Sequence, residues 1–252
     1  MVRQGLLTAL FLLLSGTSFA DAPRIAIIID DLGYHLANGE RAIRLPGPIT
    51  FSFLPGSPRA QQLAEHAHEN GKDVLLHLPL QAHSSEGGRE PSEIDLDMSR
   101  ETMSAVVSEA LRSVPHAVGV NSHRGSLLTR HPGHMLWLME EIHDRQNLFF
   151  IDSYTTHESV ALQMARESGV AATRRDVFLD HDGRRETVRR ELQRLKNLAR
   201  ERGQAFEIHG VDGHVAHLRL RIGARVAHRI GGRGLRLVGA LVEKGCSVVW
   251  QP

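Results

Sequence analysis

The sequence has one cysteine, few aromatic residues and no excess of charge of either sign. Cys246 has no partner for an internal disulfide bond, and a single thiol is too few for a metal site built on cysteine. Aromatic residues make up 5% of the 252 residues, and the formal net charge is +1. So small a charge gives no overall field to attract nucleic acid or an anionic membrane. We therefore expect neither a disulfide scaffold nor a nucleic-acid partner.

Long apolar runs are also scarce, and the longest lies at the N-terminus. Arg3 precedes the apolar run Leu6–Leu14, and the small residues Ser18 and Ala20 follow at the spacing of a cleavage site. This pattern is typical of a secretory signal peptide over residues 1–20, with an uncleaved membrane anchor as the alternative. No later segment is apolar enough to cross a bilayer. We expect an exported, periplasmic protein that has no stable membrane span after cleavage.

Histidine is the residue present in excess. The chain carries 16 histidines beside an ordinary apolar share of 41% and a charged share of 23%. A chain of this length can bury one good core and need not form more than one domain. Several histidines directly follow predicted strands, which is where α/β proteins place their functional residues. We expect one domain over residues 23–252.

Predicted strands and helices alternate along the chain. Apolar and β-branched runs predict strands at 24–29, 49–54, 73–77, 117–121, 148–152, 170–172, 177–180 and 204–208. Helical spacing predicts helices at 34–45, 57–70, 99–114, 134–146, 159–168 and 186–202. Pro79 is predicted to end the third strand, and the polar stretch 82–97 is predicted to be a surface loop. The alternation indicates an α/β protein, either a barrel or a doubly wound sheet.

The first predicted strand runs directly into two adjacent carboxylates. Residues 25–29 are apolar throughout, as expected of a strand buried on both faces of a parallel sheet, and Asp30 and Asp31 follow them. Loops at the carboxyl ends of parallel strands are where α/β proteins build their sites. The pair therefore indicates a functional site. The alternative is that an Asp caps the following helix while Gly33 makes the turn.

Carboxylates and imidazoles follow most of the other predicted strands as well. The strand-end residues are Asp30, Asp31, His77, His123, Asp152, Asp180 and His209. If the strands are parallel and the sheet curls into a barrel, these side chains converge at the carboxyl end of the barrel. Two imidazoles and a carboxylate suit zinc or another first-row divalent ion, and they leave positions open for water and substrate. Such an ion lowers the pKa of its water, and a neighbouring carboxylate can take the proton, so the pattern favours metal-assisted hydrolysis.

Each of these residues also has a purely structural interpretation. His77 could be a half-buried strand histidine, and His123 could belong to a polar turn. Asp152 could be only the N-cap of a helix. Arg175 could pair with its neighbour Asp176, or it could orient a catalytic aspartate. On the residues alone these alternatives stay open.

Five motifs fall in an order seen in one known family. They are Ile29–Gly33 (IDDLG), Leu76–Leu80 (LHLPL), Gly119–Ser126 (GVNSHRGS), Phe149–Ser153 (FFIDS) and Arg174–Asp180 (RRDVFLD). Over residues 23–208 the sequence thereby resembles the divergent polysaccharide deacetylases, a distant branch of the metal-dependent carbohydrate esterases. The resemblance implies a distorted (β/α) barrel. It also implies hydrolysis of an N- or O-acetyl group on a cell-envelope polysaccharide.

The resemblance assigns roles to the strand-end residues. It implies that Asp31, His77 and His123 bind a divalent metal, with Zn²⁺ expected, and that Asp30 acts as the base. The wider superfamily has a second histidine four residues after the first, where this sequence has Gln81. His123 is expected to supply the ligand that is missing there.

Three further residues complete the candidate catalytic set. These are Asp152, Arg175 and His209. The partner that the resemblance implies is a polysaccharide or a peptidoglycan-like glycan.

The C-terminal part departs from the family pattern. In place of the family's Gly-His-Pro turn the chain has Glu207–Asp212, which lacks proline, and the following Val215–Arg236 is rich in arginine. A family-like ending returns at 235–242. The atypical segment at about 210–234 is either an arginine-rich surface helix or the product of a compensated shift of reading frame, which the coding DNA would reveal.

Two other functions compete with a deacetylase. The missing second histidine and the missing Gly-His-Pro turn favour a barrel that has lost catalysis and serves as an envelope glycan-binding or scaffolding protein. A metal-dependent phosphate hydrolase is a further option, because carboxylates with Mg²⁺ can serve that chemistry. The lack of a glycine-rich phosphate loop disfavours it. The intact residues Asp30, Asp31, His77 and His123 favour the deacetylase.

Overall fold

The apolar run of the first predicted strand forms an interior strand of a curved parallel sheet. In this computed structural model the strands of the sheet are β1 (Arg24–Leu32), β2 (Thr50–Phe53), β3 (Val74–Leu80), β4 (Ala117–Arg124), β5 (Phe149–Asp152), β6 (Ala172–Arg174), β7 (Val177–Phe178) and β8 (Gln204–Gly210). Their order is β6-β5-β4-β3-β2-β1-β8-β7, and every neighbouring pair is parallel. The order follows the sequence from β1 to β6, and β6 and β7 form the two edges of the sheet.

The structure describes residues 23–83, 89–145, 148–179, 184–210, 237–239 and 248–250. The predicted signal peptide at 1–20, Asp180, Cys246 and nearly all of the atypical segment at 210–234 lie outside the described residues. Two short strands, β9 (Leu237–Gly239) and β10 (Val248–Trp250), pair antiparallel, and β10 lies against β1.

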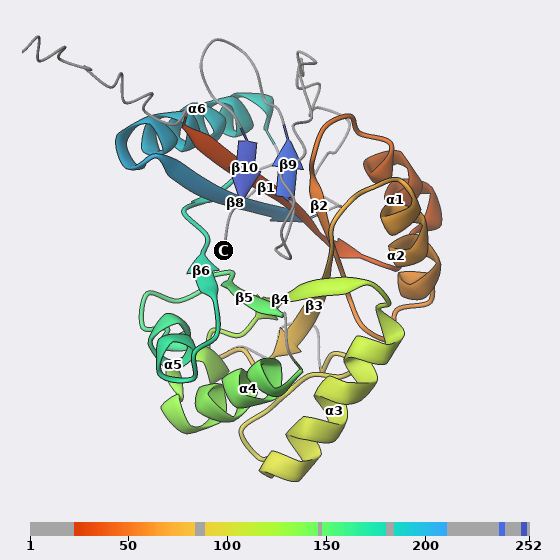
Figure 1. The fold of residues 1–252 in the computed structure, drawn as a ribbon, viewed down its shortest axis with the longest axis vertical. Helices are drawn as coiled ribbons and strands as arrows, with labels where there is room; N and C mark the ends of the chain where they lie inside the picture. Colours follow the sequence, from red (N-terminus) through yellow and green to blue (C-terminus); the bar gives the residue numbers. More distant parts are fainter. Residues whose placement is uncertain are drawn as a thin grey trace, which may run out of the picture.

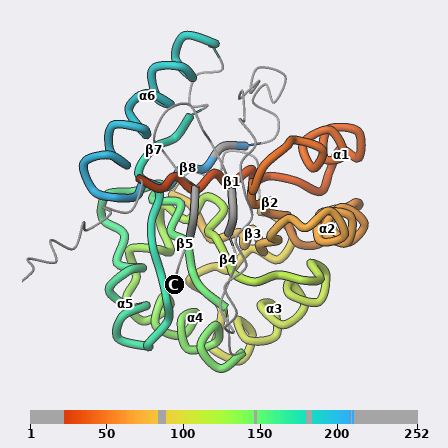
Figure 2. The backbone as a smooth tube through the Cα atoms, turned by 45° about the horizontal axis from the view of Figure 1, so that its top comes forward, coloured from red at the N-terminus to blue at the C-terminus, as the bar shows by residue number. Residues whose placement is uncertain are grey.

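The helices cover the convex side of the sheet (Figures 1 and 2). They are α1 (Leu36–Ile43), α2 (Ala60–Glu69), α3 (Arg100–Ser113), α4 (Pro132–Asp144), α5 (Ala161–Glu167) and α6 (Arg185–Arg202), with a 3-10 turn at Leu128–Arg130. A doubly wound sheet carries helices on both faces and reverses its strand order. The predicted α/β barrel is therefore confirmed, in the form of a single-domain half-barrel. Within the described part of the chain, no helix is long and apolar enough to cross a bilayer.

Both faces of the sheet are buried, as the unbroken apolar run predicted. Ile25, Ile27 and Ile29 belong to the larger core between the sheet and the helices. Ala26 and Ile28 belong to a smaller core inside the curve. Alternate residues of a strand point to opposite faces. Polar residues that come next in the alternation of Ala26 and Ile28 therefore also lie on the inner face of the half-barrel.

Strand β3 runs through Pro79 and does not end before it, so this sequence-based prediction is wrong. Proline has no N–H to donate, but beyond Leu76 the β2 side of β3 faces Ile94 instead of β2. Ile94 donates its N–H to the Pro79 carbonyl at 2.9 Å, and its own carbonyl accepts the N–H of Gln81 at 2.9 Å. The Ile94 side chain is fully buried. Part of the predicted surface loop 82–97 is thus a core segment.

Gly119 of β4 marks tight packing inside the curve. A Cβ atom at this position would lie 2.6 Å from the ring of Phe149. Phe149 stands opposite Gly119 in the register of β4 and β5. Its side chain is almost fully buried, so the ring is enclosed by the protein.

We expect Gly119→Ala to lower the free energy of unfolding by about 1–3 kcal/mol, because the added methyl group displaces the Phe149 ring. Gly133→Ala in α4 is a matched control, since a Cβ atom there meets nothing within 4 Å and alanine favours a helix. Urea unfolding of both variants measures the difference. Equal stabilities would contradict the close packing of Gly119 against Phe149.

Candidate metal centre

The side chains of the candidate centre share the inner face of the sheet. On β1, Asp30 comes two residues after the inner residue Ile28 and therefore faces the same side. On β3, His77 comes two residues after the inner residue Leu75. On β4, Asn121 stands beside His77 in register, and His123 stands two residues further on. Strands that run in parallel all end at one edge of the sheet. These polar residues therefore meet at the carboxyl end of the half-barrel.

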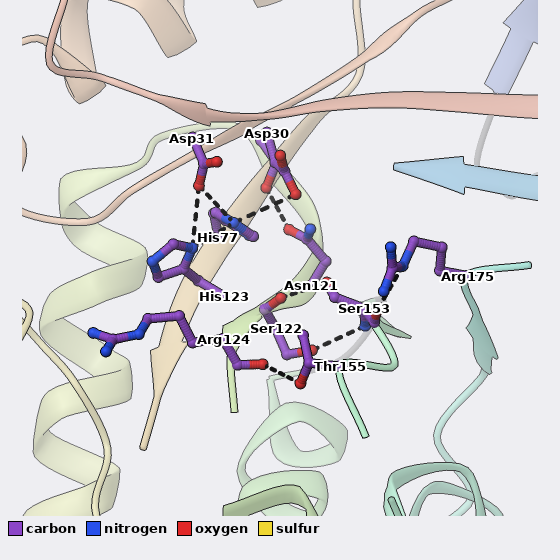
Figure 3. Close-up of polar contacts among 11 residues, drawn as sticks. Asp30, Asp31, His77, Asn121, Ser122, His123, Arg124, Ser153, Thr155 and Arg175 are labelled. Atoms are coloured by element: carbon purple, nitrogen blue, oxygen red, sulfur yellow. Dashed lines mark hydrogen bonds and ion pairs between the residues drawn. The ribbon is translucent and has the colours of Figure 1, made fainter. Parts of the chain in front are cut away.

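A bulge in β1 brings a second carboxylate to this face. Successive strand residues normally point to opposite faces, so a regular strand would turn Asp31 toward the helices. The register between β1 and β2 shifts between Ile29 and Leu32, and Asp31 has a left-handed backbone with a φ of 58°. Such a bulge re-aims the side chains beside it. Both carboxylates therefore point toward His77 (Figure 3).

Three potential ligand atoms meet at one point (Figure 3). Oδ1 of Asp31 lies 3.2 Å from Nε2 of His77 and 3.1 Å from Nδ1 of His123. The two imidazole nitrogens are 3.0 Å apart. Oδ2 of Asp30 lies 3.5 Å from Nε2 of His77. The structure thus brings together four of the predicted site residues, which come from β1, β3 and β4.

The charges of this cluster depend on one another. Burial by itself would raise the pKa of Asp31, but the contacts with His123 and His77 outweigh it and hold that pKa far below its ordinary range. Burial by itself would lower the pKa of His77, but the charge of Asp30 and the contact with Asp31 raise it above its ordinary value. In the absence of a cation, Asp31 and His77 therefore each favour the charged form of the other. Metal binding displaces the proton of a charged imidazole, because an imidazole ligand must be neutral.

The three atoms fit a metal ion. In a tetrahedral site with bonds of about 2.1 Å, neighbouring ligand atoms lie about 3.4 Å apart, and here the spacings are 3.0–3.2 Å. Oδ1 of Asp31 is buried and makes no hydrogen bond of good geometry, although both imidazole nitrogens lie close to it. A charged oxygen in this position is costly to bury without a partner. A cation shared with His77 and His123 would satisfy it, so these residues form a possible metal-binding triad.

Gln81 occupies the position at which the wider superfamily has its second histidine. Its Oε1 accepts the N–H of Leu96 at 3.0 Å. Its backbone carbonyl accepts the N–H groups of Leu127 and Leu128 at 3.2 and 3.0 Å. The carboxamide of Gln81 therefore holds the segment that follows β3, and the second imidazole of the triad comes from His123 on the neighbouring strand.

Asp152 ends β5 and holds the loop that follows it. Its Oδ1 accepts the N–H of Tyr154 at 2.8 Å, and its Oδ2 accepts the hydroxyl of Ser159 at 2.7 Å. Burial raises the pKa of Asp152, and the hydrogen bonds from Ser159 and Tyr154 offset this only in part. Asp152 therefore shapes the loop between β5 and α5.

Arg175 follows β6 and reaches back to the same loop. Its Nε donates to the carbonyl of Ser153 at 2.6 Å, and its Nη2 donates to the carbonyl of Tyr154 at 3.3 Å. Asp176, the neighbour considered as its ion-pair partner, lies 3.1 Å from the guanidinium of Arg202. Arg175 thus ties the β6 edge of the sheet to the loop after β5.

His209 lies on β8, where its backbone stands beside Ile29 of β1. The next pair in the register joins Asp30 with Gly210. The backbone of His209 is therefore close to the carboxylate end of β1. Its side chain is not among the described parts of the chain.

Two polar side chains beside the triad were missed by the sequence-based prediction. Ser52 of β2 and Asn121 of β4 are both fully buried, and a short hydrogen bond joins the Ser52 hydroxyl to the Asn121 carboxamide oxygen. The sequence signal that could have found them is a polar residue at the inner position of an otherwise apolar strand, since such residues are rarely buried without a reason.

Comparisons with known proteins agree with this architecture. A model of the divergent polysaccharide deacetylase family matches residues 27–240. Uncharacterized protein YibQ of Escherichia coli (strain K12) is 35% identical over 187 residues, which cover 74% of this chain and 58% of YibQ. An uncharacterized protein of Haemophilus influenzae is 35% identical over 197 residues, which cover 76% of this chain and 68% of that protein. This chain therefore spans less than two thirds of the length of YibQ.

A solved structure shows the same fold. The crystal structure of uncharacterized protein ATU2773 from Agrobacterium tumefaciens C58 matches with a TM-score of 0.75 and 23% sequence identity. The match covers 80% of this chain and 82% of that chain. At this level of identity the likeness concerns the fold alone.

We expect the stability of the metal-free protein to depend on pH through the Asp31–His77 pair. The lowered pKa of Asp31 stabilises the fold above its ordinary value of 3.8, and this contribution is lost as the pH falls. The raised pKa of His77 stabilises the fold below its ordinary value of 6.5, and this contribution is lost as the pH rises. The pair should therefore stabilise most between these two values.

Urea unfolding in the presence of a chelator measures this contribution. Asp31→Asn removes the charge while asparagine still tolerates the left-handed backbone. The difference in unfolding free energy between wild type and Asp31→Asn should be largest between pH 3.8 and 6.5 and shrink on either side. A difference that is constant with pH would contradict the pairing.

Proposed function

The chain belongs to the divergent polysaccharide deacetylase family, and we propose that it is a metal-dependent hydrolase that removes acetyl groups from a polysaccharide of the cell envelope. The observation that supports this most directly is the convergence of Asp31, His77 and His123 at the carboxyl end of the sheet. Membership of the family supports a carbohydrate-related role. A peptidoglycan-like glycan as substrate and a periplasmic location complete the proposal.

Zinc is the ion that the donor set suits best. Two imidazoles and one carboxylate are a ligand set of catalytic zinc sites, which keep a position open for water or substrate. Mg²⁺ and Ca²⁺ prefer sites made of oxygen atoms, so the imidazoles of His77 and His123 disfavour them. When bound, zinc polarises a carbonyl oxygen and lowers the pKa of a water molecule.

Asp30 is the proposed base. The residue is only 6% exposed, and its Oδ2 lies 3.5 Å from Nε2 of His77, beside the triad. The bulge in β1 holds this carboxylate on the same face as Asp31. A carboxylate in this position can take the proton of the water that attacks the acetyl carbonyl, and can then pass it to the departing amine or alcohol.

Asp152, Arg175 and His209 are the further proposed catalytic residues. The two hydrogen bonds of Asp152 shape the loop after β5. Arg175 is fixed by the carbonyls of Ser153 and Tyr154, and Figure 3 shows it on the far side of Asn121 from His123. A guanidinium that is held in place can orient oxygen atoms of a glycan near the centre.

A glycan-binding or scaffolding protein is the second candidate. Gln81 stands where the wider superfamily has a histidine, and its Oε1 accepts a hydrogen bond from the N–H of Leu96. The centre is thus assembled differently from that of the wider superfamily. Such a protein would bind zinc and glycan without releasing acetate.

We expect the purified protein to hold stoichiometric zinc, and His77→Ala and His123→Ala each to lose it, because each removes one ligand of three. His68→Ala should keep it. His68 is an exposed histidine of α2 that stacks on His116 with a centroid distance of 3.9 Å. Elemental analysis after dialysis measures the zinc. If wild type holds none, or both ligand variants hold as much as wild type, the ligand assignment fails.

We expect Asp30→Asn to keep its zinc but to release acetate from acetylated glycans at least about 100-fold more slowly, because an amide cannot take the proton. Asp97→Asn is the matched control, since Asp97 is exposed and lies in the segment before α3. An enzyme-coupled acetate assay measures the rate. Zinc binding without acetate release by wild type would favour the glycan-binding protein over the hydrolase.

A further inference from the structure

We propose that Asn121 and Ser52 form a positioning pair that selects the tautomer of His77 needed for metal binding. Nε2 of His77 faces Asp31 and His123, so a metal at the triad needs the lone pair on Nε2 and the hydrogen on Nδ1. The Asn121 carboxamide oxygen accepts that hydrogen, and the Ser52 hydroxyl holds the carboxamide in place. This inference rests on the proposed metal site and adds two residues that act through His77.

Nδ1 of His77 can form hydrogen bonds only with other groups of the protein. The residue is 2% exposed, so bulk water does not reach the ring. Nδ1 is buried and makes no hydrogen bond of good geometry. Asn121 stands directly beside His77 in the register of β3 and β4. Its carboxamide oxygen is therefore the acceptor that we assign to Nδ1 in the zinc-bound protein.

The path of the hydrogen bond from Ser52 to Asn121 explains why the carboxamide oxygen lies next to His77. Ser52 belongs to β2 and Asn121 to β4, and β3 lies between them in the sheet. The bond between the two side chains must therefore cross the inner face of β3. Ser52 is level with Leu75, two residues before His77. The oxygen that Ser52 holds is thus turned toward β3, beneath the imidazole.

A carboxamide oxygen favours one tautomer because it can only accept a hydrogen bond. With the hydrogen on Nδ1, the lone pair of Nε2 points at the triad. With the hydrogen on Nε2, the ring donates to Asp31 and cannot bind a metal. Hydrogen bonds to the far nitrogen of a ligating histidine typically change metal affinity by about 10–100-fold.

Zinc affinities measured by competition with a chelator test the pair. We expect Asn121→Ala to bind zinc about 10–100-fold more weakly than wild type. Ser52→Ala should bind about 3–10-fold more weakly, because the carboxamide loses one hydrogen bond. Asn121→Asp should bind at least as tightly as wild type, since a carboxylate is a common partner of a ligating histidine. Ser104→Ala, which removes a hydroxyl bonded to Glu141 at 2.9 Å, is the matched control.

Nitrogen NMR of the zinc-free protein, at a pH at which His77 is neutral, gives a readout that a purely structural role would not move. The fraction of His77 with its hydrogen on Nδ1 should be larger in wild type and in Asn121→Asp than in Asn121→Ala. An equal fraction in wild type and folded Asn121→Ala overturns the inference. Equal zinc affinities of wild type, Ser52→Ala and folded Asn121→Ala overturn it too. If Asn121→Ala does not fold, Ser52→Ala and Asn121→Asp decide the question.

Different outcomes distinguish the proposed metal site from the positioning pair. If the wild-type protein binds no zinc, both the proposed metal site and the positioning pair are contradicted. If wild type binds zinc and the variants bind it equally well, only the positioning pair is contradicted.

Discussion

The bulge at the end of β1 is the constraint on which the candidate centre depends. A regular strand would turn Asp30 and Asp31 to opposite faces. The left-handed backbone of Asp31, with a φ of 58°, turns both carboxylates inward, at a cost of roughly 1–2 kcal/mol for a residue other than glycine. Gly33 follows with a φ of 130°, and a Cβ atom there would lie 1.8 Å from the hydroxyl oxygen of Ser57. The apolar core on both faces of β1 holds this local strain in place.

Burial on both faces of the sheet also sets the electrostatics of the centre. Below the level of His77 the inner face is mostly apolar, and above that level it is polar. Charges at this boundary are poorly solvated, so each depends on its neighbours: Asp31 on two imidazoles, and His77 on two carboxylates. Asn121 lies level with His77 and Ser52 lies two residues lower, and this neutral pair adds no charge. This arrangement makes a cation the natural partner of the triad.

In the candidate centre the second imidazole comes from a neighbouring strand. In the wider superfamily the second histidine comes from the segment after the first, whereas here that position is Gln81, whose carboxamide holds Leu96. His123 comes from β4, the neighbour of β3, and brings its Nδ1 to 3.0 Å from Nε2 of His77. Ligand geometry depends on where the atoms meet and not on the spacing along the chain. The same chemistry is therefore open to both arrangements.

The order of strands and helices and most of the strand-end residues could be predicted from the sequence, because apolar periodicity and turn residues act locally. The sequence also indicated Asp30, Asp31, His77 and His123, since charged groups after buried strands are conspicuous. Four features could not be predicted in this way: the bulge in β1, the passage of β3 through Pro79, the burial of Ile94 and the contact of Ser52 with Asn121. Each of these depends on which strands lie side by side, and that pairing joins segments far apart in the chain.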